Sequence, residues 1–295
     1  PELPPNVRLI VSTLPGRSLD ELTRRRWPAM TVGLLTLEER RALIPRYLRQ
    51  YGKALAAAEV ERLASAEQTR NPLFLRTLLE ELRVWGEYET LKERIDDYLG
   101  AASIPALFEK VFIRWEDDYE GDTDLVGEVL SLLVCARRGL SVPELLQVLG
   151  SEDQPLPRAV LAPLLFAAGD TLMDRSGLLG PSHDFARQAV LDVYLPARAT
   201  RRQCHMRLAD HFAKQPLGPR KLDELPWQLE RAEEWQRLSD LLAEEEFFGA
   251  AWKANQFEVK AYWANVERSS SLRMVEPTRA SLPVSMGKTS NGKLA

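Results

Sequence analysis

Apolar residues recur at intervals of three and four positions along most of this chain, the spacing that places them on one face of an α-helix. The spacing is clear where Leu43, Ile44, Tyr47 and Leu48 follow one another. Nearly the whole chain is therefore expected to be helical. The predicted helices cover residues 19–27, 37–51, 57–69, 73–85, 91–99, 104–119, 125–136, 142–149, 160–168, 182–194, 201–214, 222–232, 235–245 and 247–263.

Residues that favour helix starts precede several of these segments. Thr36 can cap the second predicted helix, with Glu38 and Glu39 in the first turn, where the helix dipole favours acidic side chains. Ser141 can cap the helix that follows it. Pro72 suits a first helical turn, because its ring fixes φ near the helical value. These local signals set the predicted boundaries.

A run of β-branched and aliphatic residues between prolines breaks the helical pattern near the N-terminus. Val7, Leu9, Ile10 and Val11 belong to this run. Such a run is typical of a strand buried on both faces inside a parallel sheet. A parallel strand needs neighbours, and the rest of the chain predicts helices, so we expect the partner strands upstream of Pro1. The chain is then expected to be the downstream part of a larger protein and to begin inside a nucleotide-binding domain.

The order of the predicted elements suggests several domains in a mainly α fold. Residues 171–179 predict a small hairpin, and three helices, a hairpin and a helix form a winged-helix pattern. Later helices come in pairs, as in an α-solenoid, although no repeat of about 34 residues is visible. The expected domains are the last strand of an NTPase domain (1–17), a helical lid (18–100), a winged-helix domain (101–197), a helical repeat-like region (198–268) and a disordered tail (269–295).

The composition is that of a soluble globular protein, with 45% hydrophobic and 28% charged residues. A net charge of -4 gives no reason to expect nucleic acid or an acidic membrane as a partner. Two cysteines, Cys135 and Cys204, cannot build a disulfide framework and suggest a reducing compartment, which we take to be the cytoplasm. No apolar stretch reaches the roughly 18 residues of a membrane span.

The sequence offers one weak candidate for a phosphate-binding loop. Gly287, Lys288 and Thr289 match the end of the P-loop pattern, but Leu282 stands where its first glycine belongs. No strand precedes this segment and no helix follows it, whereas a phosphate cradle needs backbone N–H groups held at a strand-to-helix turn. We therefore expect no tight nucleotide binding and no ATPase activity from this chain alone.

Other clusters of polar residues suggest neither a metal site nor a catalytic site. Residues 116–124 predict an acidic, solvated loop that lacks the terminal glutamate of a calcium loop. Cys204 and His205, with His211, lack a second ligand pair at zinc spacing. Ser182, His183 and Asp184 are adjacent on one helical turn, so they cannot converge as a catalytic triad does.

Four segments, in order, resemble motifs of the NACHT-type STAND NTPases, and in particular the nephrocystin-3-like, tetratricopeptide-coupled members. They are the strand and turn at residues 7–15, which resemble the sensor 1 segment; Asn71-Pro-Leu-Phe-Leu75 of the lid; residues 136–145 of the winged helix; and residues 178–184, which end with His183 and Asp184. The resemblance covers roughly residues 3–213, in which no P-loop is found.

The resemblance implies a set of nucleotide contacts in the longer protein, with ATP or ADP and Mg²⁺ as cofactors. Ser12 and Thr13 would belong to the sensor segment. Pro72 would lie against the base, with Asn71 in the same nucleotide-binding motif, and His183 would contact the ADP phosphates in a closed state. Each also has a local interpretation, since asparagine and proline commonly start helices. His183 can simply be a helix-start residue. The family's sensor arginine is replaced by Leu14, and Pro181 stands where an aromatic residue or methionine is common.

Three functions remain open at this point. The first is a fragment of a STAND-type signalling switch that supplies the lid, the winged helix and the start of a protein-binding repeat array, and that self-assembles when ATP replaces ADP. The second is a non-catalytic helical scaffold whose NTPase half has decayed. The third is a winged-helix DNA-binding regulator, which predicts a basic recognition helix, whereas residues 142–149 contain Glu144 and neither lysine nor arginine.

Overall fold

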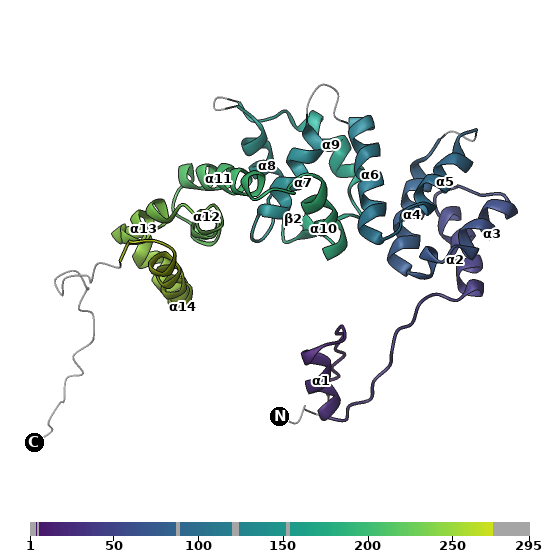
Figure 1. Cartoon of the computed structure of the whole chain (residues 1–295), viewed down its shortest axis with the longest axis horizontal. Coiled ribbons are helices and arrows are strands. Elements are labelled where there is room, and N and C mark those ends of the chain that lie inside the picture. Colours follow the sequence, from purple (N-terminus) through teal and green to yellow (C-terminus); the bar gives the residue numbers. More distant parts are fainter. Residues whose placement is uncertain (1–3, 5, 87–88, 120–123, 152–153, 274–295) are drawn as a thin grey trace, which may run out of the picture. The chain divides into compact units, whose positions relative to one another are not determined.

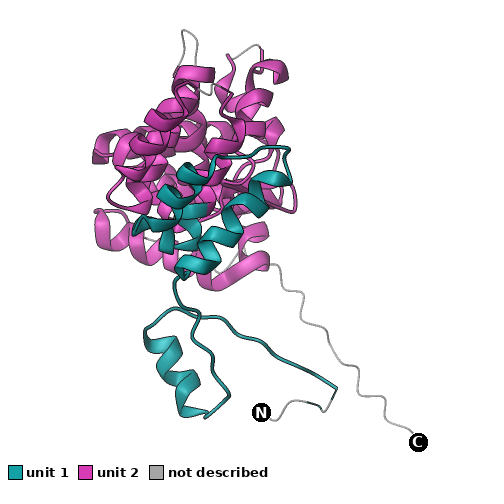
Figure 2. Ribbon diagram, turned by 90° about the vertical axis from the view of Figure 1, so that its right-hand side faces the viewer, with its two compact units in different colours: residues 1–75 teal, residues 76–295 magenta. Residues whose placement is uncertain are grey.

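The computed structural model describes residue 4 and residues 6–86, 89–119, 124–151 and 154–273. The chain divides into two compact units, Pro1–Leu75 and Arg76–Ala295, which are coloured separately in Figure 2. The described residues are mainly helical, and their sheet has two strands (Figure 1). The expectation of a mainly α fold is thus confirmed at this coarse level.

The first unit contains α1 (Arg17–Arg24), α2 (Leu37–Arg49), α3 (Ala57–Ser65), the short 3₁₀ turn η1 (Gln68–Arg70) and the first residues of α4 (Pro72–Val84). In this unit, α2, α3 and η1 pack together around a buried polar centre. Thr36 caps α2 and Glu39 returns the bond, as the sequence predicts for this start. The buried Thr69 hydroxyl donates to the Leu63 carbonyl over 2.7 Å, and Arg40 donates to Thr69 over 3.1 Å.

The strand predicted near the N-terminus is not formed. Residues 8–14 carry no regular secondary structure, and the side chains expected to be buried are exposed, with Ile10 at 96%. A strand requires a neighbour to pair its N–H and C=O groups. Among the described residues, the sheet consists of β1 and β2 alone, so this apolar run has no partner there.

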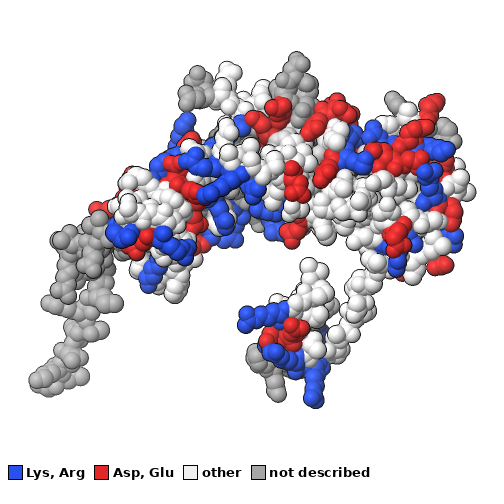
Figure 3. All heavy atoms as spheres, in the orientation of Figure 1, with Lys and Arg blue, Asp and Glu red and all other residues white. Residues whose placement is uncertain are grey.

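The second unit contains the remaining elements. Their bounds are α5 (Leu91–Leu99), α6 (Ile104–Tyr119), α7 (Leu125–Cys135), α8 (Val142–Leu149), α9 (Arg158–Ala167), β1 (Leu172–Arg175), β2 (Leu178–Pro181), α10 (Asp184–Val193), α11 (Arg198–Lys214), α12 (Pro219–Arg231), α13 (Trp235–Ala243) and α14 (Glu245–Ser269). On the face shown in Figure 3, acidic and basic side chains are interspersed over these helices.

Helix α7 lies at the centre of this unit. Every residue from Val129 to Cys135 is buried, because α6, α8, α10, α11 and β2 all pack against this helix. An apolar run without a polar face is the expected sequence for a helix that is covered on all sides. The order of the surrounding elements, with α8, α9, the β1–β2 hairpin and α10 following α7, is the order the sequence predicts.

The hairpin is joined to the loop after α7. β1 and β2 pair antiparallel, and Ser176 and Gly177 both have positive φ at the tight turn between them. Leu140 and Leu179 exchange two backbone hydrogen bonds of 3.0 and 2.8 Å. Gly139 has a φ of +90°, and a Cβ there would lie 2.2 Å from the Leu179 carbonyl oxygen, so only glycine permits this approach.

A buried ion pair holds α4, α5 and α6 together inside the second unit. Arg114 of α6 donates two hydrogen bonds to the Glu81 carboxylate, and the Tyr98 hydroxyl of α5 donates to the same carboxylate over 2.8 Å. The side chains of Arg114 and Glu81 are each 6% exposed. Arg114 also pairs with Asp118, one turn along α6.

Residues 116–119 received two conflicting sequence predictions, a loop and a helix, and the Arg114–Asp118 ion pair helps to decide between them. Their acidity predicts a loop, whereas the apolar spacing predicts a helix through Tyr119. The structure continues α6 through Tyr119, so the start of the predicted acidic loop is wrong. Arg114 neutralises part of the negative charge on this last turn, which favours the helix.

The last four helices pack as two consecutive pairs. α11 lies against α12 and α13 against α14, while α12 also contacts α13 and α14. α14 is bent at Asn255, whose φ and ψ of -160° and 92° are not helical. The Asn255 side chain accepts a hydrogen bond from the Phe257 amide over 3.1 Å, so it caps the second half of the helix.

Two predictions fall wholly or partly outside the described residues. The expected disordered tail begins at Ser269, which still ends α14, and residues 274–295 are not described. The weak P-loop match at residues 287–289 lies among them. Within the described part of the chain, no helix is both long and apolar enough to cross a membrane. The domain boundaries at 17, 100, 197 and 268 stay predictions.

Candidate functional site

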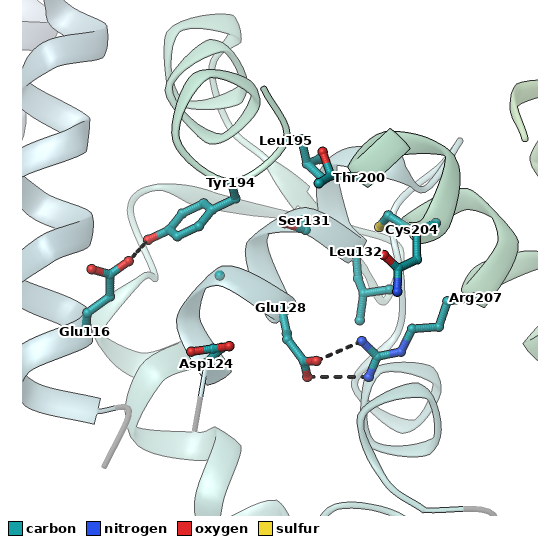
Figure 4. Close-up of a pocket in the computed structure, with 12 residues that line it drawn as sticks. Glu116, Asp124, Glu128, Ser131, Leu132, Tyr194, Leu195, Thr200, Cys204 and Arg207 are labelled. Carbon is teal, nitrogen blue, oxygen red and sulfur yellow. Dashed lines mark hydrogen bonds and ion pairs between the residues drawn. The ribbon is translucent and has the colours of Figure 1, made fainter. Parts of the chain in front are cut away.

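Helices α6, α7 and α11, with the chain that leaves α10, line a cavity of about 550 Å³ in the second unit (Figure 4). Its walls carry carboxylates, hydroxyls, an amide, a guanidinium and a thiol. The lining residues are Glu116, Asp124, Gly127, Glu128, Ser131, Leu132, Tyr194, Leu195, Thr200, Gln203, Cys204 and Arg207.

Ion pairs and hydrogen bonds fix the polar walls of this cavity. Arg207 of α11 donates to both Glu128 oxygens of α7, over 3.0 and 3.4 Å, and to the Val148 carbonyl over 3.1 Å. On another wall the Tyr194 hydroxyl donates to the Glu116 carboxylate of α6, as Figure 4 shows. These contacts join residues that are far apart in the sequence, and they hold three helices around one space.

A glycine on α7 allows the tyrosine to reach its partner. A Cβ built at Gly127 would lie 2.9 Å from Cδ1 of the Tyr194 ring, a distance that real Cβ contacts do not show. The Tyr194 ring therefore packs directly against the backbone of Gly127, where any other residue would place a Cβ. Tyr194 also contacts Phe112, with ring centroids 6.0 Å apart. The position of this wall thus depends on Gly127.

A pair of cysteines borders the cavity. Cys204 is half-buried and lines it, whereas Cys135, at the end of α7, is buried. A hydrogen bond from Cys204 lowers the pKa of Cys135 to about 5, with a further contribution from His205 and against the effect of burial. The contact with Cys135, together with burial, raises the pKa of Cys204. Burial alone would lower the pKa of His205, but Cys135 and Gln228 raise it.

Behind the thiols, a fully buried carboxylate collects hydrogen bonds from three directions. Glu224 of α12 has no exposed surface. It accepts from the backbone amides of Arg137 and Arg138, over 3.1 and 3.0 Å, and from Arg220 over 3.2 Å. Gln228 donates to Glu224 over 2.9 Å. We call these residues the Glu224 cluster.

The Glu224 cluster extends to the thiol pair and to the cap of α8. Gln228 donates to the Cys135 carbonyl over 3.1 Å, and its amide oxygen lies 2.7 Å from Nδ1 of His205. Arg220 donates to the Gly139 carbonyl and to Glu144, the residue that closes the capping box of α8. Side chains of α12 therefore donate hydrogen bonds to the carbonyls of Cys135 and Gly139, at and after the end of α7. They also contact the capping box at the start of α8.

The residues predicted to contact a nucleotide in the first unit occupy simple local positions. Ser12 and Thr13 lie exposed in the irregular segment, where the Thr13 hydroxyl donates to the Leu14 carbonyl over 3.1 Å. Asn71 accepts from the Leu73 amide over 2.9 Å and so caps α4, of which Pro72 is the first residue. Their nucleotide role stays a prediction.

His183, the predicted phosphate contact of the second unit, precedes α10 as its N-cap residue. Its backbone is extended, its side chain is exposed, and that side chain makes no capping hydrogen bond. Pro181, which departs from the family pattern, ends β2. As far as the structure describes the chain, no three histidine, cysteine, aspartate or glutamate side chains lie close enough together to hold a metal ion.

Sequence reasoning missed the cavity and the Glu224 cluster. Cys204 and His205 stood out as a pair, but only as zinc candidates. Glu224 gave no local signal, because it lies about 100° and 140° around the helix from Leu225 and Leu229 and so falls off the leucine stripe. Its donors lie 86 and 87 residues away, so no local pattern could identify them.

Several curated proteins are similar to this chain. A TPR repeat-containing protein of Dictyostelium discoideum is 29% identical over 271 residues, which cover 90% of this chain and 16% of the relative. Tetratricopeptide repeat protein 41 of Rattus norvegicus is 26% identical over 278 residues, or 80% of this chain and 21% of the relative. The Mus musculus protein of that name is 27% identical over 208 residues, 58% of this chain and 16% of the relative.

The chain therefore spans about a fifth or less of the length of the curated relatives it matches. No family profile and no solved structure matches it. The relatives are TPR repeat-containing proteins by name, and this chain is mainly helical, with its last four helices in pairs.

The cavity wall supplies a direct test with a matched control. Gly127→Ala should destabilise the second unit by about 1–3 kcal/mol, because the added methyl displaces the Tyr194 ring and breaks its bond to Glu116. Gly249→Ala, in α14, adds the same methyl where no atom lies within 4 Å and should be neutral or slightly stabilising. Urea unfolding of both variants measures the difference. Equal stabilities would contradict the placement of Tyr194.

Proposed function

We propose that this chain is a helical module of a protein-interaction scaffold. The observation that carries the proposal is the serial packing of α11 with α12 and of α13 with α14. Helix pairs stacked in series bury one face against their neighbours and leave extended surfaces free for partners. The names of the relatives support the same function, because tetratricopeptide repeats are built from helix pairs.

The Glu224 cluster supports a scaffold in which the paired helices keep a fixed orientation relative to α7 and α8. It attaches the paired helices to the end of α7 and to the start of α8 through buried, charged hydrogen bonds. Arg137 adds ion pairs to Asp223 of α12 and Glu258 of α14. A partner bound on the paired helices is thereby held in a fixed orientation to the α6–α10 segment of the same unit.

An aromatic surface on α14 is the strongest candidate for the partner contact. Phe248 and Trp252 stack with ring centroids 5.5 Å apart, and Phe257 is 75% exposed. Lys260 lies over the Trp252 and Phe257 rings at 5.3 and 5.9 Å. Interfaces are enriched in large aromatic side chains, which contribute most of the binding energy where they become fully buried.

Charge introduced on this surface should strongly reduce partner capture. The variant Trp252→Glu with Phe257→Glu replaces two exposed aromatic side chains and should reduce the recovery of specific partners at least about tenfold, the effect of losing one hot-spot residue. Phe166→Glu is the control, since Phe166 of α9 is 83% exposed and lies outside the paired helices. Quantitative affinity capture with each tagged chain measures the loss. Equal recovery by both variants would refute the assignment of the surface.

A nucleotide-dependent switch is the second candidate function. It is favoured by the order of α7, α8, α9, the hairpin and α10, with the Leu140–Leu179 bridge joining the hairpin to the loop before α8. Under this proposal residues 101–197 form a winged-helix domain, residues 18–100 a lid, and the longer protein binds ATP or ADP with Mg²⁺ and assembles on exchange. Ser12, Thr13, Asn71, Pro72 and His183 are then its nucleotide contacts.

The switch ranks behind the scaffold for two reasons. The relatives are named for their repeats, and Leu14 replaces the arginine that would sense the γ-phosphate. A scaffold whose NTPase half has decayed reconciles both proposals. The DNA-binding regulator ranks last, because Glu144 of α8 is engaged by Arg220 and the helix offers no cation to a phosphate.

His183 separates the switch from the decayed scaffold. In a longer protein that contains this chain and a phosphate-binding loop, His183→Ala should weaken ADP retention and favour the open, assembling form. The closed-to-open ratio should change roughly 10- to 100-fold, the equivalent of one charge-assisted hydrogen bond of about 1.5–3 kcal/mol. Asn255→Ala is the control, because Asn255 lies far from His183 in the sequence and its side chain bonds to nearby backbone of α14. Bound ADP per protomer and oligomer size are measured together. A folded His183→Ala variant that keeps its ADP and stays monomeric would exclude the switch.

A further inference from the structure

The two cysteines of this chain lie together, although they are far apart in the sequence. Cys135 ends α7 and Cys204 lies in α11, a helix that packs along α7. A side-chain hydrogen bond links the Cys135 and Cys204 thiols. Gln228 contacts both the Cys135 carbonyl and His205, the residue next to Cys204, and so fixes the two helices at this point.

The cavity gives a small reagent a route to the thiol pair. Cys204 lines its wall beside Ser131 and Leu132 of α7, and Figure 4 shows the sulfur at this space. Cys135 lies behind Cys204 and is 5% exposed. A small molecule that enters the cavity therefore meets the Cys204 sulfur, while Cys135 does not line the cavity.

Charged neighbours act on the two thiols in opposite directions. His205 contacts the Cys135 sulfur, and Arg187 favours a negative charge on Cys135 as Arg207 does on Cys204. Burial opposes the charge at both thiols, and Glu128 opposes it at Cys204. The hydrogen bond with Cys204 and the contact with His205 lower the pKa of Cys135, which favours its thiolate form. A thiolate is the form of cysteine that reacts with peroxides.

We propose that Cys135 and Cys204 form a redox-modification site, in which a hydroperoxide entering the cavity oxidises the pair to a disulfide that joins α7 to α11. The thiolate sulfur attacks the O–O bond and becomes a sulfenic acid, while the leaving alkoxide or hydroxide takes up a proton. The second thiol then attacks the sulfenic sulfur and displaces water. Two thiols and one hydroperoxide give one disulfide, one water and one alcohol, or two waters from hydrogen peroxide.

The disulfide would fix the position of α11 on α7. These helices form the junction between the α6–α10 segment and the paired helices, so the disulfide would hold that junction more rigidly. It would also reduce the width of the cavity beside Cys204. A thiol reductant would restore the reduced pair by exchange. The inference stands apart from the proposed function, because it depends only on the thiols and the cavity.

The cysteine content makes the test unambiguous, since any intramolecular disulfide must join Cys135 to Cys204. Purified chain is treated with hydrogen peroxide, its remaining thiols are alkylated, and its mass is measured without reduction. We expect the loss of two hydrogen atoms, no alkylation, a rise in Tm of several degrees and full reversal by dithiothreitol. Cys204→Ala and Cys135→Ala should each leave one alkylatable or over-oxidised sulfur.

A third variant tests the assistance by histidine. His205→Gln removes the imidazole beside Cys135 and should slow disulfide formation severalfold at neutral pH, while the final yield stays the same. Far-UV circular dichroism establishes that each variant is folded. Two free thiols after exhaustive peroxide treatment, sulfinic acid without a disulfide, or disulfides only between chains would each overturn the proposal.

Discussion

The buried carboxylate of Glu224 is the interaction on which the second unit depends. A charged side chain without exposed surface is stable only when its oxygens are fully hydrogen-bonded. Two backbone amides, Arg220 and Gln228 supply those bonds. Because the amides belong to the loop after α7, the carboxylate determines where α12 lies against the preceding helices.

The cavity and the thiol pair follow from this attachment. Once α12 is fixed, Gln228 holds His205 and the end of α7, and α11 is confined between α7 and α12. Cys204 and Arg207, on the same helix, are then placed against Cys135 and Glu128. The aromatic surface of α14 is positioned through the same region, because Arg137 pairs with Glu258. A scaffold needs such coupling if partners are to be held at fixed positions.

Local chemistry made most helices predictable. The predicted bounds of α5 and α6 match the structure, and Thr36 and Ser141 form complete capping boxes at the starts they were expected to mark. Helix α12 begins three positions before the predicted residue 222, at Pro219, which suits a first turn. Each of these features is decided within a few residues, so the sequence contains the required information.

Features that depend on distant partners were not predictable. The N-terminal apolar run has strand composition but no neighbouring strand among the described residues, and composition cannot supply one. Acidity alone suggested a loop from residue 116, whereas Arg114 and Tyr194 stabilise acidic side chains on a continued helix. The cavity required Gly127 and Tyr194 to meet across the fold. The Tyr194–Glu116 bond and the Gly127–Tyr194 contact are tertiary interactions that no local pattern contains.

The most direct test of this account is amide hydrogen exchange on Glu224→Gln. The substitution keeps the shape of the side chain but removes the charge and turns one acceptor into a donor facing donors, at a cost of about 3–5 kcal/mol. In the wild-type chain, amides of α7 and α12 should exchange through a common opening; in the variant, α11–α14 should exchange much faster while α7 stays protected. Unchanged exchange in α12 would show that the Glu224 cluster does not hold the two parts together.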